Sequence, residues 1–89
     1  SPAVEVVQNL RASGAVLCYS DPYVPTLALS ECLLRSVALT PALLHSMDCS
    51  VVLTHHSAFD YTLIATHSPL IVDSRNALKD FSAPHIFRL

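Results

Sequence analysis

The residues that could carry chemistry are five histidines, three cysteines and a polar run that ends in arginine and asparagine. His55 and His56 are neighbours, so on a strand they would point to opposite faces and could not bind one metal ion together. The sequence has no Cys-x-x-Cys or His-x-x-x-His spacing, and such spacings are typical of zinc sites. We therefore predict no metal site.

The three cysteines are weak candidates for a nucleophile. Cys18 and Cys49 fall in predicted buried strands, where a thiol behaves as a small hydrophobic group. Cys32 has no histidine that the sequence pairs with it. An odd number of cysteines without metal-like spacing indicates reduced thiols in a cytoplasmic protein. We predict no catalytic residue in this chain.

Arg75 is the strongest candidate for a binding residue. It follows the apolar run Leu70–Val72 and stands between Asp73 and Asn76. The planar guanidinium group of arginine suits phosphate and carboxylate groups. An ion pair between Asp73 and Arg75 that only closes the loop is an equally good interpretation of the same residues.

Two strands and a helix must position these polar residues. Val51–Leu53 and Leu70–Val72 are short apolar runs of the kind that form buried strands. Between them, Ser57 and Asp60 have the spacing of a capping box, which predicts a helix that begins near Ser57. Strand, helix and strand give a right-handed parallel βαβ unit. Ligands of open α/β sheets bind at the carboxyl ends of the strands, so both polar runs are expected at the functional edge.

The remaining elements are predicted from caps, turns and apolar spacing. Thr26–Arg35 reads as a helical turn or an apolar loop, and Asp21 reads as a turn residue rather than a ribose contact. The other expected elements are a helix over Ser1–Ser13 stopped by Gly14, a buried strand Ala15–Tyr19, an edge strand Ser36–Leu39, a helix Pro41–Met47 capped by Thr40, and a terminal edge strand His85–Leu89.

Length and composition indicate one small domain over residues 1–89, and the strand–helix–strand pattern indicates that it is α/β. More than half of the residues are apolar, which excludes a disordered chain. A net charge of −2 gives no basic surface for nucleic acid, and no apolar run reaches the roughly 20 residues that cross a membrane. The sequence begins at Ser1-Pro2, which resembles a helix start, so we expect a fragment of a longer protein.

Four motifs, in this order, resemble the C-terminal UDP-binding domain of the UDP-glucose/GDP-mannose dehydrogenases, most closely the UDP-N-acetylhexosamine 6-dehydrogenases. They are Ser-Pro-Ala at the start, Tyr-Ser-Asp-Pro-Tyr-Val-Pro at 19–25, His-Ser-Ala-Phe-Asp-Tyr at 56–61 and Val-Asp-Ser-Arg-Asn at 72–76. The resemblance implies a Rossmann-like fold, a three-layer, open and mostly parallel sheet that here lacks the usual first strand.

The resemblance also implies a function. Such enzymes oxidise the C6 alcohol of a UDP-sugar to a carboxylate, which supplies polysaccharide precursors, and they form homo-oligomers. NAD binds to an N-terminal domain that this chain lacks. The catalytic cysteine also lies in a segment that this chain does not contain, so the isolated chain should be inactive and hold no cofactor. Gly14 is the only glycine, so no G-x-G-x-x-G loop is present to cradle a dinucleotide. Arg75 matches the arginine of the family's Val-Asp-x-Arg-Asn motif, which implies that it binds the substrate. Asn76 is a weaker candidate for the same role.

The sequence departs from this family at two motifs. His55 stands where the family usually has aspartate, and Ser74 where threonine is usual. A missing first strand would leave unpaired sheet edges. This supports an alternative, a non-catalytic Rossmann-like module that serves association. A third possibility is an unrelated small Rossmann-like binding domain, which the four ordered motifs disfavour.

Overall fold

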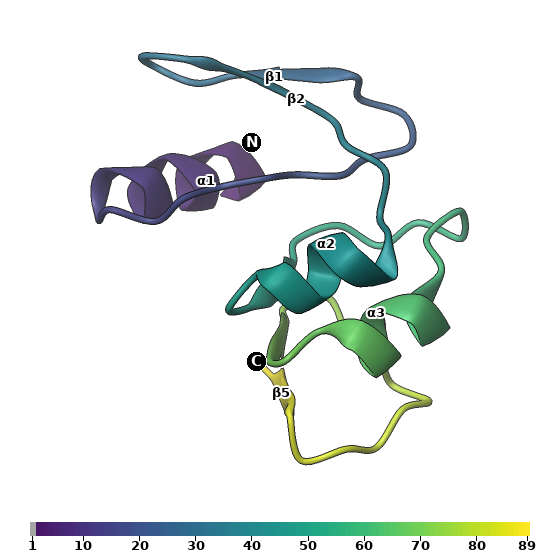
Figure 1. The fold of residues 1–89 in the computed structure, drawn as a ribbon. Coiled ribbons are helices and arrows are strands. Elements are labelled where there is room, and N and C mark those ends of the chain that lie inside the picture. Colours follow the sequence, from purple (N-terminus) through teal and green to yellow (C-terminus); the bar gives the residue numbers. More distant parts are fainter. Residues whose placement is uncertain (1) are drawn as a thin grey trace. The chain divides into compact units, whose positions relative to one another are not determined.

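The computed structural model describes residues 2–89. The chain divides into two compact units, Ser1–Ala38 and Leu39–Leu89. The predicted capping role of Ser1 lies outside the described residues. No helix within residues 2–89 is both long and apolar enough to cross a membrane. Figure 1 shows the order of the elements along the chain.

The first unit begins with helix α1, Pro2–Ala12. Its end is a Schellman motif, in which the N–H of Gly14 donates to the carbonyl of Arg11 at 3.0 Å and that of Ala15 to the carbonyl of Leu10 at 3.1 Å. Gly14 has a φ of +99°, a left-handed conformation that is easy only for glycine. The structure confirms both the predicted helix and its stop.

The rest of the first unit differs from the prediction. Ala15–Tyr19 is not a strand, because only Tyr19 finds a partner, in a single parallel bridge to Ser36. The expected strand Ser36–Leu39 is reduced to the same bridge. Thr26–Arg35 was predicted as a helical turn or loop, and it forms an antiparallel hairpin instead, of strands β1, Thr26–Ala28, and β2, Leu33–Arg35.

Polar contacts join α1 to the tip of this hairpin. The Ser30 hydroxyl donates to Oε1 of Gln8 at 2.6 Å, and Arg11 pairs with Glu31 at 3.5 Å. Every residue from 2 to 38 keeps at least part of its surface exposed. This unit is therefore held by local turns and surface hydrogen bonds rather than by a buried core.

The second unit contains the predicted βαβ arrangement. Helix α2, Pro41–Ser46, leads into strand β3, Ser50–Val52, which is followed by helix α3, Tyr61–His67, and strand β4, Ile71–Asp73. The sheet has the order β3-β4-β5, and β5, Ile86–Arg88, is also parallel to β4. Both predicted strands of the unit are confirmed, displaced by one residue each, and β5 is the predicted terminal edge strand.

The two helices of this unit are capped by side chains. The Thr40 hydroxyl accepts from the N–H of Leu43 at 3.1 Å, as predicted. Helix α3 is capped by Asp60, whose carboxylate accepts from the N–H of Leu63 at 3.0 Å, so the prediction of Ser57 as the cap was wrong. Residues 56–59 form a separate turn, closed by the N–H of Phe59 on the carbonyl of His56, and the helix begins only after that turn.

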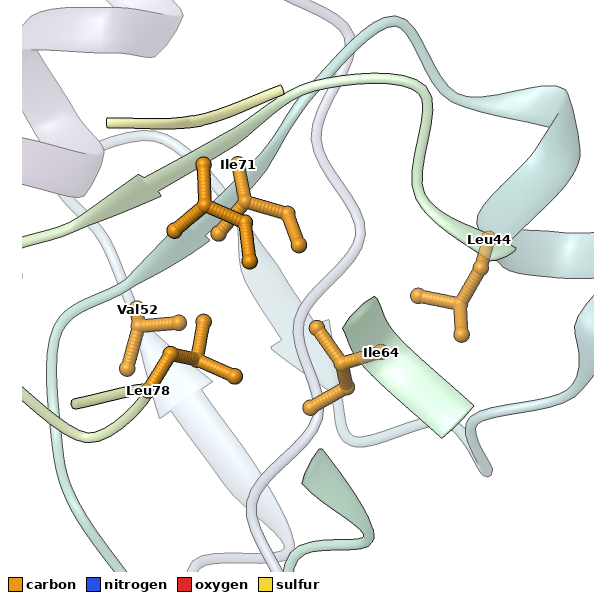
Figure 2. Packing of buried hydrophobic residues seen from close by; sticks show 6 residues of the cluster. Leu44, Val52, Ile64, Ile71 and Leu78 are labelled. Carbon is orange, nitrogen blue, oxygen red and sulfur yellow. The ribbon is translucent and has the colours of Figure 1, made fainter. Parts of the chain in front are cut away.

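The core lies between one face of the sheet and the two helices. Figure 2 shows side chains from the strands and helices gathered in this layer. On the opposite face, the register aligns Val51, Val72 and Phe87, and Val51 is 41% and Phe87 54% exposed. Residues 39–89 thus form two layers, one of helices and one of strands. The third layer that the sequence analysis expected is not among these residues. The six buried hydrophobic residues are Leu44, Val52, Ile64, Ile71, Leu78 and Ile86.

The end of α3 is completed by a residue distant in sequence. Ser68 donates its N–H to the carbonyl of Ile64 at 3.1 Å, but Pro69 has no N–H with which to reach the carbonyl of Ala65. The ring of His85 takes this place, with Nε2 at 2.7 Å from the Ala65 oxygen. Because a carbonyl only accepts, Nε2 of His85 carries the hydrogen.

Candidate functional site

The two polar runs that follow β3 and β4 lie at the same edge of the sheet. Ser74, the first residue after β4, donates both its N–H and its hydroxyl to the carbonyl of Val52, at 3.2 and 2.6 Å. This brings the beginning of the Ser74–Leu78 turn beside the end of β3. The prediction that both runs leave the carboxyl edge of a parallel sheet is confirmed.

Asp73 organises the turn that follows β4. Its side chain is fully buried, and Oδ1 accepts from the N–H groups of Arg75 at 3.0 Å and Ala77 at 3.1 Å, while Oδ2 accepts from Leu78 at 2.8 Å. Burial by itself would raise the pKa of this carboxyl. The three N–H donors and the charge of Arg88 outweigh that effect, and the pKa lies below its ordinary value.

Arg75 does not pair with Asp73. Among residues 2–89, only Arg11 and Glu31 form an ion pair, and the guanidinium of Arg75 has no hydrogen-bond partner there. Its backbone N–H is held by Asp73, and its side chain is exposed. The interpretation of Asp73 and Arg75 as a local ion pair was therefore wrong. The turn fixes the backbone of Arg75 and leaves its cationic group facing solvent.

Asn76 has a structural part in this turn. Its φ is +56°, and it is the only described residue other than glycine with a positive φ. Asparagine adopts this left-handed conformation more readily than most residues. The reversal at Asn76 lets the N–H groups of Ala77 and Leu78 point back to the Asp73 carboxylate. The side chain of Asn76 itself is exposed next to Arg75.

A cluster of four rings follows β3. The ring centroids of His55 and Tyr61 are 5.5 Å apart, those of His56 and Phe59 5.6 Å, and those of Phe59 and Tyr61 5.9 Å. The Tyr61 hydroxyl also accepts from the N–H of His56 at 3.1 Å. This cluster was not predicted from the sequence, where Phe59 and Tyr61 appeared only as members of the motif at 56–61.

The histidines of this cluster do not gather with other metal ligands. Nowhere in the described chain do three histidine, cysteine, aspartate or glutamate side chains lie close enough to hold a metal ion. His55 is exposed and packs against Tyr61. It therefore brings an aromatic ring to this edge of the sheet.

The cysteines differ from their predicted positions. Cys18 is exposed, because the strand expected to bury it does not form. Cys49 lies just before β3 and is half-buried. Burial raises the pKa of the Cys49 thiol, and the charge of Asp48 adds to this although a backbone hydrogen bond from Val72 opposes it. A raised pKa disfavours the thiolate, which is the nucleophilic form.

Asp21 closes a turn, as predicted. Its Oδ1 accepts from the N–H groups of Tyr23 and Val24 at 2.8 and 3.2 Å. Its own N–H donates to the hydroxyl of Ser36 at 2.9 Å, and that hydroxyl donates in turn to the Asp21 carbonyl. The contacts between Asp21 and Ser36 join the residues that precede β1 to the residue that follows β2.

Comparison with known proteins gives one family. The model of the UDP-glucose/GDP-mannose dehydrogenase family, UDP binding domain, matches residues 1–80. No curated protein and no solved structure gives a significant match. The matched range includes α1 to β4 and the turn with Arg75, and it ends before β5.

Proposed function

The chain belongs to the UDP-glucose/GDP-mannose dehydrogenase family, as its UDP binding domain, and on this basis we propose that it binds the UDP-sugar substrate of an NAD-dependent 6-dehydrogenase. The parent enzyme oxidises the C6 alcohol of the sugar to a carboxylate. NAD and the catalytic cysteine belong to other parts of that enzyme, and residues 1–89 are the substrate-binding domain.

Finer features of this proposal come from the resemblance of the motifs. The order of Ser-Pro-Ala, Tyr-Ser-Asp-Pro-Tyr-Val-Pro, His-Ser-Ala-Phe-Asp-Tyr and Val-Asp-Ser-Arg-Asn supports a substrate of the UDP-N-acetylhexosamine type. We propose a cytoplasmic homo-oligomeric enzyme of polysaccharide precursor synthesis.

The exposed, unpaired guanidinium of Arg75 is the observation that supports this function best. UDP carries a diphosphate, and arginine binds phosphate oxygens with two parallel hydrogen bonds. Arg75 stands at the carboxyl edge of the parallel sheet on a turn whose backbone is already fixed by Asp73. A ligand therefore has only the arginine side chain to order, which lowers the entropic cost of binding. Asn76, exposed beside it, offers an amide to the same ligand.

Substitution of Arg75 tests the assignment. We expect Arg75→Ala to weaken UDP binding by roughly 10- to 100-fold, because one charge-assisted hydrogen-bond pair contributes about 1.5–3 kcal/mol. Calorimetric titration of the full chain with UDP measures the change. In the parent enzyme, the same substitution should raise the KM for the UDP-sugar with little effect on NAD affinity.

Lys79→Ala is the matched control, since Lys79 is exposed in the next turn and has no hydrogen-bond partner within residues 2–89. It should leave the UDP affinity within twofold of the unsubstituted chain. An Arg75→Ala chain that binds UDP as tightly as the control would remove Arg75 from the site.

The alternative function, an association module, is supported by the outer face of the sheet. Val51, Phe87 and Leu89 are 41%, 54% and 90% exposed, and β3 is an edge strand. Light scattering of the full chain separates the two functions when combined with the UDP titration. A dimer that Phe87→Ser dissociates, in a chain that does not bind UDP, would favour the association module.

A further inference from the structure

We propose that Arg88, in β5, is a positioning residue for Arg75, because it supports the turn after β4 and is the cross-strand partner of the buried Asp73. This inference rests on the proposed function, since it concerns how Arg75 is kept available to the diphosphate. Arg88 lies beyond the residues that match the family model.

The first observation is that Arg88 joins β5 to the turn. Its Nη2 donates to the carbonyls of both Leu78 and Phe81. The same two residues are joined by a backbone hydrogen bond, from the N–H of Phe81 to the carbonyl of Leu78, at 2.9 Å. Arg88 thus completes the hydrogen bonding of the segment that begins at Asp73 and carries Arg75.

The second observation is the register of the sheet. Asp73 and Arg88 are partners across β4 and β5, and the N–H of Leu89 donates to the Asp73 carbonyl at 3.1 Å. Partner residues of parallel strands project to the same face of a sheet. The Arg88 charge is accordingly among the causes that lower the pKa of Asp73.

The electrostatic consequence concerns both arginines. A buried carboxylate needs compensating charge and hydrogen bonds. Asp73 receives three backbone hydrogen bonds and faces the positive charge of Arg88, so it does not require the guanidinium of Arg75. Removing Arg88 would leave Arg75, two residues along the chain, as the cation available to Asp73. An arginine paired with Asp73 is no longer free to bind a diphosphate.

Two substitutions of Arg88 in the full chain test this. Arg88→Met removes the charge and both hydrogen bonds but keeps an extended side chain, and Arg88→Lys restores the charge alone. We expect Arg88→Met to weaken UDP binding about tenfold by calorimetry, and Arg88→Lys to recover part of that loss. Arg35→Met, in β2, is the matched control, because the guanidinium of Arg35 is exposed and has no hydrogen-bond partner in the described chain. It should bind UDP as the unsubstituted chain does.

A second readout does not depend on UDP. NMR titration of the Asp73 carboxyl is compared with and without Arg75→Met. With Arg88 present, Arg75→Met should leave the Asp73 pKa unchanged; in the Arg88→Met chain it should raise that pKa, because Arg75 has moved onto Asp73. If Arg88→Met does not fold, the same comparison is made with Arg88→Gln, which also lacks the charge but keeps a polar side chain.

The outcomes separate this inference from the proposed function. A chain that does not bind UDP, but in which Arg75 couples to Asp73 only after Arg88 is removed, contradicts the function and supports the positioning role. UDP binding that Arg88→Met leaves unchanged, together with no new coupling between Arg75 and Asp73, would overturn the positioning role.

Discussion

At the scale of single residues, Asp73 is the group on which the site depends. It is buried, it accepts three backbone hydrogen bonds, and its pKa is lowered from an ordinary value of 3.8. Folding therefore favours the charged form. Its contribution to stability is present above the ordinary pKa and is lost as the pH falls through that value to the lower pKa of the folded state.

Asp73→Asn should lower the free energy of unfolding by about 2–4 kcal/mol at pH 7, because the amide group cannot accept from the N–H of Leu78 and the charge is gone. Denaturant unfolding between pH 2 and pH 7 measures the effect. The difference between the two chains should shrink below pH 4, as Asp73 becomes protonated in the unsubstituted chain. A difference that stays constant down to pH 2 would contradict the lowered pKa.

The sequence predicted the site at this scale only in part. It placed Arg75 and Asn76 at the carboxyl edge of the sheet, where the structure has them, but it left open whether Asp73 pairs with Arg75. A carboxylate can accept equally well from a guanidinium or from backbone N–H groups, and the choice depends on the path of the chain. That path is set by the left-handed backbone of Asn76. Asparagine permits this conformation but does not require it, so the residue type alone does not specify the path.

At the scale of secondary structure elements, the caps of α2 and α3 can be tested directly. Thr40→Ala and Asp60→Ala each remove a side chain that accepts from the first turn of a helix. Each should lower the free energy of unfolding by about 1 kcal/mol, the usual contribution of a helix N-cap. Thermal unfolding followed by circular dichroism measures both.

Thr62→Ala controls for these two substitutions. Thr62 is exposed in α3 and caps nothing. Alanine has the higher helix propensity, so this chain should be as stable as the unsubstituted one or slightly more stable. If Asp60→Ala were no more destabilising than Thr62→Ala, then Asp60 would not cap α3 in solution.

The elements that the sequence predicted well are those with local signals. The helices α1 and α2 have a glycine stop and a threonine cap, and the βαβ unit has apolar runs of strand length. The predictions for Thr26–Arg35 and Ala15–Tyr19 were wrong because a strand forms only where it has a partner to pair with. The sequence of a segment does not show which partner it has. Val16, which the sequence places in a buried strand, is 88% exposed.

At the scale of the whole molecule, the two units differ in how they are stabilised. All six buried hydrophobic residues belong to Leu39–Leu89, and Ile71 and Leu78 are fully buried. In Ser1–Ala38, every residue from 2 onward retains exposed surface. Burial of apolar surface is the dominant favourable contribution to folding, so the two units should have different local stabilities.

Hydrogen exchange of the full chain measures this difference. The amides of β4 should exchange most slowly, because that strand is hydrogen-bonded on both sides and carries Ile71. The amides of α1 and of the hairpin should exchange at least tenfold faster, since their opening exposes no buried core. Equal protection of α1 and β4 would show that the first unit is covered in solution.

The end of helix α3 links two positions that the sequence shows as unrelated. Pro69 has no N–H for the Ala65 carbonyl, and His85 supplies the hydrogen bond instead. A chain that gained any other residue at position 69 would give Ala65 a second donor, and a later change at His85 would then cost less. Whether a substitution at position 85 is tolerated in evolution therefore depends on what position 69 already holds, and the order in which the two mutations arise matters.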